Sequence, residues 1–146
     1  ARAQYHLAVM HDRGANGRRD PKAAAQLYRR AAEQGDSRAQ YDLAQMYLAG
    51  EGVPRDEAEA LKWFLASARR GSALARYNLG ICYAKGRGCV ADPVEAHAWL
   101  CLAAASGHDK VADPARRGAA ALAEALGPDG LAKSRKRQAA LAEVAS

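Results

Sequence analysis

A 36-residue internal repeat is the feature that most constrains how this chain can fold. Shifting the sequence by 36 positions aligns residues of the same type three times without an insertion. The matched sets are Ala3, Ala39 and Ala75; Tyr5, Tyr41 and Tyr77; Leu7, Leu43 and Leu79; Gly14, Gly50 and Gly86; Asp20, Asp56 and Asp92; Ala24, Ala60 and Ala96; and Gly35, Gly71 and Gly107. A period of this length is typical of stacked supersecondary units, which bury their apolar faces only against their neighbours.

Each repeat is expected to form two antiparallel helices. In the middle repeat, apolar residues at helical spacing predict a first helix over about 38–49, which ends at Gly50 because glycine takes the left-handed C-cap conformation most easily. The carboxylate of Asp56 is expected to cap the second helix. The spacing from Ser37 to Gln40 also predicts a capping box at the start of the first helix.

The composition agrees with one all-α domain. The chain has 146 residues, a length that fits one compact unit and excludes a multidomain enzyme. Hydrophobic residues make up 49% of the chain and aromatic residues only 6%, so burial must come from many small side chains packed between helices. No apolar run approaches the ~20 residues that a transmembrane helix needs.

The repeats have the pattern of a known family. The middle repeat contains AQYDLAQMYLAGEGVPRDEAEALKWFLASARRG and the third contains ARYNLGICYAKGRGCVADPVEAHAWLCLAAASG, and both resemble the Sel1-like repeat, a relative of the tetratricopeptide repeat. The resemblance covers residues 1–108 and implies an α-solenoid of three helix-pair repeats, 1–36, 37–72 and 73–108. Repeat one departs most, with Leu27 and Tyr28 where Trp63 and Phe64 stand. There Asn16 replaces a turn glycine, and we expect it to take positive φ.

The two ends of the chain differ in what is expected to cover them. Residues 109–146 predict a C-terminal capping pair, with helices over 112–126 and 131–144 separated by the turn 127–130. At the other end, the outer sides of Tyr5 and Leu7 lack a visible cover. We therefore expect either a fragment of a longer repeat array or an end that pairs with another chain.

Candidate contact residues follow from the positions of the first helices that change between repeats. First helices line the concave surface of solenoids of this kind, and positions that keep one apolar type are expected to pack. The changing sets are Arg2, Arg38 and Leu74; His6, Asp42 and Asn78; Val9, Gln45 and Ile81; and Arg13, Ala49 and Lys85. Within each first helix, successive changing positions are four, three and four residues apart, so they form one helical stripe. This stripe resembles the ligand-facing positions of tetratricopeptide grooves. The nominated partner-binding residues are Arg38, Asp42, Gln45, Asn78, Ile81 and Lys85, although the same positions also fit an ordinary solvated surface.

The sequence predicts no catalytic set, no metal site and no cofactor. The histidines lack the spacing of zinc motifs, and no nucleophile elbow or phosphate-binding glycine loop occurs. Cys82 and Cys89 occupy apolar positions of the repeat and are expected to be buried, whereas Cys101 is expected to be partly exposed. Trp63 and Trp99 recur at one position of the second helix, which favours packing over stacking on bases.

We therefore expect a non-enzymatic scaffold whose partner is another protein, with no small-molecule substrate. The alternative is an electrostatic binder of nucleic acid or an anionic surface, acting through Lys133–Arg137 and the net charge of +6, with Arg116 and Arg117 nearby. A third hypothesis, implied by cysteine-rich relatives, is a hydrolase. The resemblance implies bacterial signalling, envelope or host-interaction proteins and eukaryotic degradation adaptors, and it leaves cytoplasm, periplasm and the secreted space open.

Overall fold

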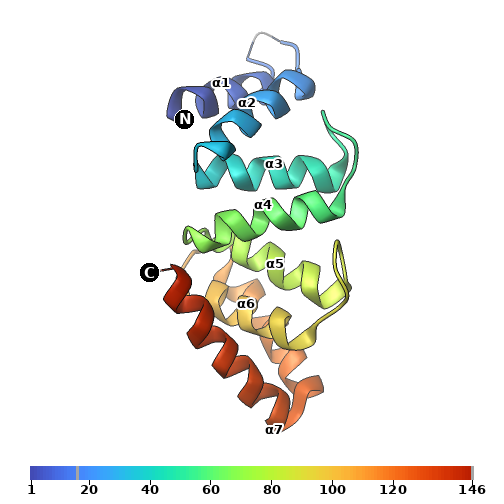
Figure 1. Ribbon diagram of the computed structural model, residues 1–146, viewed down its shortest axis with the longest axis vertical. Coiled ribbons are helices and arrows are strands. Elements are labelled where there is room, and N and C mark those ends of the chain that lie inside the picture. The colour runs from blue at the N-terminus through green and yellow to red at the C-terminus, as the bar shows by residue number, and fades with distance from the viewer. Residues whose placement is uncertain (16, 146) are drawn as a thin grey trace. The chain divides into compact units, whose positions relative to one another are not determined.

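Every regular element in the described part of the chain is an α-helix. A computed structural model describes residues 1–15 and 17–145, with the side chains of 144 and 145 excepted (Figure 1). Its elements are α1 (Arg2–Arg13), α2 (Pro21–Glu33), α3 (Ser37–Ala49), α4 (Glu57–Arg69), α5 (Ala73–Lys85), α6 (Pro93–Ala105) and α7 (Ala112–Ala145). The predicted all-α class and helix pairs are confirmed. The expected turn conformation of Asn16 lies outside the described residues.

The local signals for helix ends act as the sequence predicts. The carboxylates of Asp20, Asp56 and Asp92 accept hydrogen bonds from the amides of Ala23, Glu59 and Glu95, at 3.0, 3.1 and 3.1 Å. Gly14, Gly50 and Gly86 end α1, α3 and α5 with φ of 73°, 70° and 70°. These contacts satisfy amides and carbonyls that a helix end leaves without partners.

The capping box predicted at Ser37 is wrong. Asp36, one residue earlier, caps α3 and accepts from the amides of Arg38 and Ala39. Gln40 is buried, and its Nε2 donates to the carbonyl of Ala32 at 3.1 Å. A carboxylate is a stronger acceptor than a hydroxyl, and the buried Nε2 of Gln40 donates to the preceding helix instead of reaching back to the start of α3.

The chain divides into two compact units, Ala1–Ser67 and Ala68–Ser146. The first unit holds α1, α2, α3 and most of α4 around a core of small side chains with a few large ones. Its fully buried residues are Ala8, Ala24, Ala31, Ala39, Leu43, Ala44, Ala60, Phe64 and Ser67. The alanines let the helices come close, and the larger side chains fill the remaining volume.

The second unit packs α7 against α6 along two segments. Leu100 and Ala103 of α6 form a buried cluster with Val111, Ala115 and Ala119. Gly127 then takes φ 67° and ψ −177°, which breaks the helix, and Figure 1 shows the chain turning so that the second segment also runs along α6. The break predicted over 127–130 is confined to Gly127, because Pro128 needs no amide partner in a first helical turn.

Several expected burial states are confirmed and one is wrong. Trp63, Trp99 and Cys82 are buried, and Cys101 is half-buried. Cys89 was expected to be buried but is half-buried, because it lies in the loop after α5.

The outer side of α1 is exposed to solvent at Leu7, as the sequence predicted. Leu7 is 44% exposed and Met10 is 51% exposed, whereas the register-matched Leu43 is fully buried. Tyr5 is half-buried, with its ring 5.8 Å from that of Tyr28. Among the described residues, the helices lack the combination of length and apolarity needed to cross a bilayer.

Candidate functional site

The six nominated residues fall into two triplets, one in each unit. Arg38, Asp42 and Gln45 lie on α3, where spacings of four and three residues place them on one face. Arg38 and Gln45 are exposed and Asp42 is half-buried. The second triplet lies on α5 and consists of Asn78, Ile81 and Lys85. In it Lys85 is exposed and the other two side chains are half-buried.

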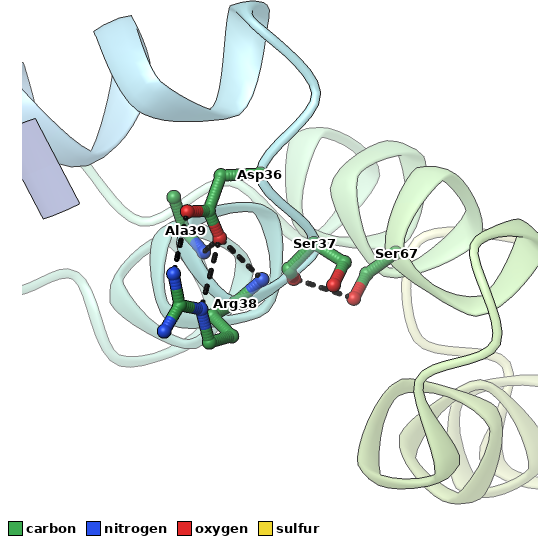
Figure 2. Close-up of polar contacts among 5 residues, drawn as sticks. All are labelled: Asp36, Ser37, Arg38, Ala39 and Ser67. Carbon is green, nitrogen blue, oxygen red and sulfur yellow. Dashed lines mark hydrogen bonds and ion pairs between the residues drawn. The ribbon is translucent and has the colours of Figure 1, made fainter. Parts of the chain in front are cut away.

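The start of α3 is held by a dense set of polar contacts (Figure 2). The guanidinium of Arg38 forms an ion pair with the carboxylate of Asp36, with Nη2 and Oδ2 at 3.0 Å. On the other side of the helix end, the hydroxyl of Ser67 donates to the carbonyl of Ser37 at 2.7 Å, which ties α4 to α3. Both the position of the helix end and the orientation of Arg38 are therefore determined within the first unit.

Arg38 also bridges from α3 to α1. Its guanidinium carbon lies 4.4 Å from the centre of the Tyr5 ring, which is the geometry of a cation–π contact. The carboxyl group of Asp42 interacts with the hydroxyl of Tyr5, and this interaction raises the pKa of Tyr5. Tyr5, Arg38 and Asp42 form a connected group, which we call the α1–α3 cluster.

The two carboxyl groups beside Arg38 have opposite pKa shifts. Burial raises the pKa of Asp42 to about 6, although the hydrogen bond from Tyr5 acts in the other direction. At Asp36, burial also opposes ionisation, but hydrogen bonds from Arg38 and from the Ala39 amide outweigh it and hold the pKa below its usual value. Asp36 is therefore ionised at neutral pH, whereas Asp42 changes its charge near pH 6.

The amide side chains of the two triplets make contacts on their own helices. Nε2 of Gln45 donates to the hydroxyl of Tyr41 at 2.6 Å. Nδ2 of Asn78 donates to the carbonyl of Leu74 at 2.9 Å. These contacts orient both amides, and the role of the six residues in binding stays a prediction.

Sequence reasoning missed the part that Tyr5 plays in the α1–α3 cluster. Tyr5 recurs as Tyr41 and Tyr77, and this recurrence favours a packing role. Its contacts with Arg38 and Asp42 join residues 33 and 37 positions apart, and their sequence spacing carries no signal of them.

The basic run of the last helix is partly used in packing. The side chains of Lys133, Arg135 and Lys136 are exposed. Arg137 forms an ion pair with Glu95 of α6, with Nε and Oε2 at 2.7 Å, and Ser134 is fully buried against the same helix. Two of the five residues therefore hold α7 on α6.

A buried Ser–His contact lies beneath this run, and no spacing in the sequence indicates it. Oγ of Ser134 is 2.6 Å from Nδ1 of His97, and Nε2 of Gln138 donates to the same hydroxyl at 3.2 Å. Sγ of Cys101 is 3.6 Å from Nε2 of His97. Burial lowers the pKa of His97 and raises that of Cys101, so both groups are neutral at pH 7.

These groups hold two helices together rather than face a substrate. Ser134 has no exposed surface, and its hydroxyl contacts both the imidazole of His97 and the side-chain amide of Gln138. In the part of the chain that the structure describes, no group of three or more His, Cys, Asp or Glu side chains is placed to hold a metal ion.

Comparison with known proteins agrees with this architecture. The Sel1 repeat profile matches residues 1–36, 37–72 and 73–108. A Sel1 repeat protein from Oxalobacter formigenes is 37% identical over 80% of this chain and 87% of its own, with a TM-score of 0.70. A search of curated proteins found no significant match.

A second solved structure shows the fold alone. It is a protective antigen present in uropathogenic Escherichia coli strains that displays an SLR fold, and it matches 96% of this chain at 24% identity with a TM-score of 0.78. This chain spans 37% of that antigen's length. Sel1 repeats generally form non-enzymatic scaffolds for protein interaction. With three matched repeats over 108 of its 146 residues, the chain belongs to the Sel1 repeat family.

Proposed function

We propose that this chain is an adaptor that binds a segment of a partner protein in the concave groove formed by the first helices of its repeats. The contacts would come from the two triplets on α3 and α5. The observation that carries the proposal is the α1–α3 cluster, in which Arg38 is exposed but already oriented by Asp36 and the Tyr5 ring.

Preorganisation is the physical reason to favour this face. Ordering a long side chain on binding costs about 0.5–1.5 kcal/mol, and an arginine held by a carboxylate and a ring has already lost much of that freedom. Arginine and tyrosine are also the residue types that contribute most to protein interfaces. The face therefore supplies a cation, a half-buried carboxyl and the exposed amide of Gln45 for a polar peptide segment.

The test is a pull-down of partner proteins from a lysate of the source organism, washed at low and at high salt. The double variant Arg38→Glu and Lys85→Glu reverses one exposed charge in each triplet. The matched control is Arg30→Glu with Lys110→Glu, which makes the same charge change at exposed positions outside the triplets. Circular dichroism establishes that all three chains are folded.

We expect a discrete protein that is retained in high salt, lost with the triplet variant and kept by the control. Capture that survives in the triplet variant would refute the assignment of the face. The other outcome is capture of nucleic acid or lipid that elutes with salt and binds both variants alike. This result would favour binding through the exposed cations Lys133, Arg135 and Lys136 instead.

A further inference from the structure

A groove lies between α2 and the loop that joins α3 to α4. One hollow of about 400 Å³ lies at the start of α2, and another of about 200 Å³ continues along the helix. The two share four lining residues and so form one groove, which we call the α2 groove. Its lining residues are Asp20, Pro21, Lys22, Ala25, Gln26, Arg29, Gly52, Val53 and Pro54. All lie in the first unit, and none belongs to the triplets.

The loop that forms one wall is fixed in place. Gly52 lies so close to α2 that a Cβ atom there would be 2.2 Å from the carbonyl oxygen of Pro21. The loop is also held at both ends, by hydrogen bonds from the Glu51 amide to Met46 and from the Asp56 amide to Tyr47, at 3.1 and 3.0 Å. The groove therefore exists before any ligand binds.

The floor is apolar, and its rim carries two cations together with the helix-capping carboxylate of Asp20. Pro21, Ala25, Val53 and Pro54 supply the apolar surface. Lys22 is exposed, and among the described residues no carboxylate forms an ion pair with it. The guanidinium of Arg29 lies over the Tyr47 ring and donates to the Tyr47 hydroxyl, which orients it and leaves its other donors for a ligand.

The acidic groups near the groove are already engaged. The carboxylate of Asp20 accepts from the amide of Ala23 as the cap of α2. Glu51, which precedes the groove-lining part of the loop, is paired with Arg19, with Oε2 and Nη2 at 3.0 Å. A ligand therefore meets two cations across an apolar floor.

We propose that the α2 groove binds an extended segment of a partner protein that carries two acidic side chains around apolar ones. Lys22 and Arg29 are seven residues apart on α2, which is a separation of about 10 Å along the helix axis. Three residues of an extended polyproline II segment rise about 9 Å and bring the side chain back to the same face. The matching ligand has acidic residues three positions apart, with apolar side chains between them that pack on Val53 and Pro54.

Protein fits this surface better than nucleic acid. None of the groove's lining residues is aromatic, so bases find no stacking surface.

The test is fluorescence anisotropy with a fluorescein-labelled decapeptide that carries two glutamates three positions apart around leucine and valine. The probe is titrated with the full chain, with Lys22→Glu and with Val53→Asp. Arg30→Glu is the matched control, because it makes the same charge change at an exposed position of α2 outside the groove. A second peptide with both glutamates replaced by glutamine isolates the charge contribution.

We expect saturable binding that Lys22→Glu and Val53→Asp each weaken by at least about tenfold, while Arg30→Glu changes it less than about twofold. The glutamine peptide should bind about tenfold more weakly. The Arg38→Glu and Lys85→Glu variant should bind the peptide like the parent chain, which separates this groove from the proposed concave face.

Three results would overturn the proposal. They are the lack of saturable binding, equal weakening by Lys22→Glu and Arg30→Glu, and displacement of the peptide by single-stranded oligonucleotide at lower concentrations than by unlabelled peptide.

Discussion

Replacing Gly52 with alanine tests whether the loop between α3 and α4 is packed as tightly on α2 as the structure shows. Gly52 has φ 72°, a region that costs an L-residue about 1–2 kcal/mol. Its new Cβ would also lie 2.2 Å from the Pro21 carbonyl oxygen, a backbone atom that cannot rotate away. Relieving such a clash by shifting backbone costs about 1–3 kcal/mol. We expect Gly52→Ala to lower the free energy of unfolding by about 2–5 kcal/mol.

Gly17→Ala is the matched control for this change. Gly17 has φ 79° in the equivalent loop of the first repeat, and a Cβ there meets nothing within 4 Å. It should therefore lose only about 1–2 kcal/mol for the left-handed conformation. The effect of alanine on the unfolded chain is the same at both positions, so the difference between the variants isolates the clash.

Urea denaturation followed by circular dichroism measures both variants against the parent chain. We expect Gly52→Ala to be less stable than Gly17→Ala by about 1–3 kcal/mol, with a lower thermal midpoint as well. Equal stabilities would show that the loop has room at Gly52, and the account of a preformed α2 groove would then fail.

Two further substitutions test buried polar groups. Because burial raises the pKa of Asp42 to about 6, the folded state binds more protons than the unfolded state between about pH 4 and pH 6, and stability from this group falls as pH rises through that window. Relative to the parent chain, the free energy of unfolding of Asp42→Asn should therefore rise by about 2–3 kcal/mol from pH 4 to pH 7 in urea titrations. A difference between the two chains that is independent of pH would contradict the pKa shift. Ser134→Ala leaves Nδ1 of His97 buried without its hydrogen-bond partner and should lower the free energy of unfolding by about 1–3 kcal/mol in the same assay, whereas a loss near zero would show that the contact contributes nothing.

The predictions that succeeded rest on short-range chemistry. The helix pairs follow from apolar spacing, the aspartate caps from a carboxylate beside free amides, and the ends of α1, α3 and α5 from glycine at φ near 70°. Each involves residues within a few positions of one another. At the start of α3 both Ser37 and Asp36 could cap the helix, and the predicted capping box at Ser37 was wrong. Asp36 is the cap, and the side-chain amide of Gln40 donates to a carbonyl of α2 instead of completing the box.

The candidate site was predictable only as a stripe of positions. The changing residues of the first helices identified Arg38, Asp42 and Gln45 as one face of α3. The ring beneath Arg38 belongs to Tyr5, on a helix two elements earlier, and the pKa of Asp42 is raised by burial. Their geometry depends on how α1, α2 and α3 pack.

The sequence by itself determined the repeat, its period, its helices and their ends, because these depend on hydrophobic spacing and on the conformational preferences of single residues. Helix packing decided which residues meet: Ser134 with His97, Arg38 with Tyr5, and the backbone of Gly52 with that of Pro21. Those partners are 37, 33 and 31 residues apart, and their contact depends on the close approach of helices that small side chains allow.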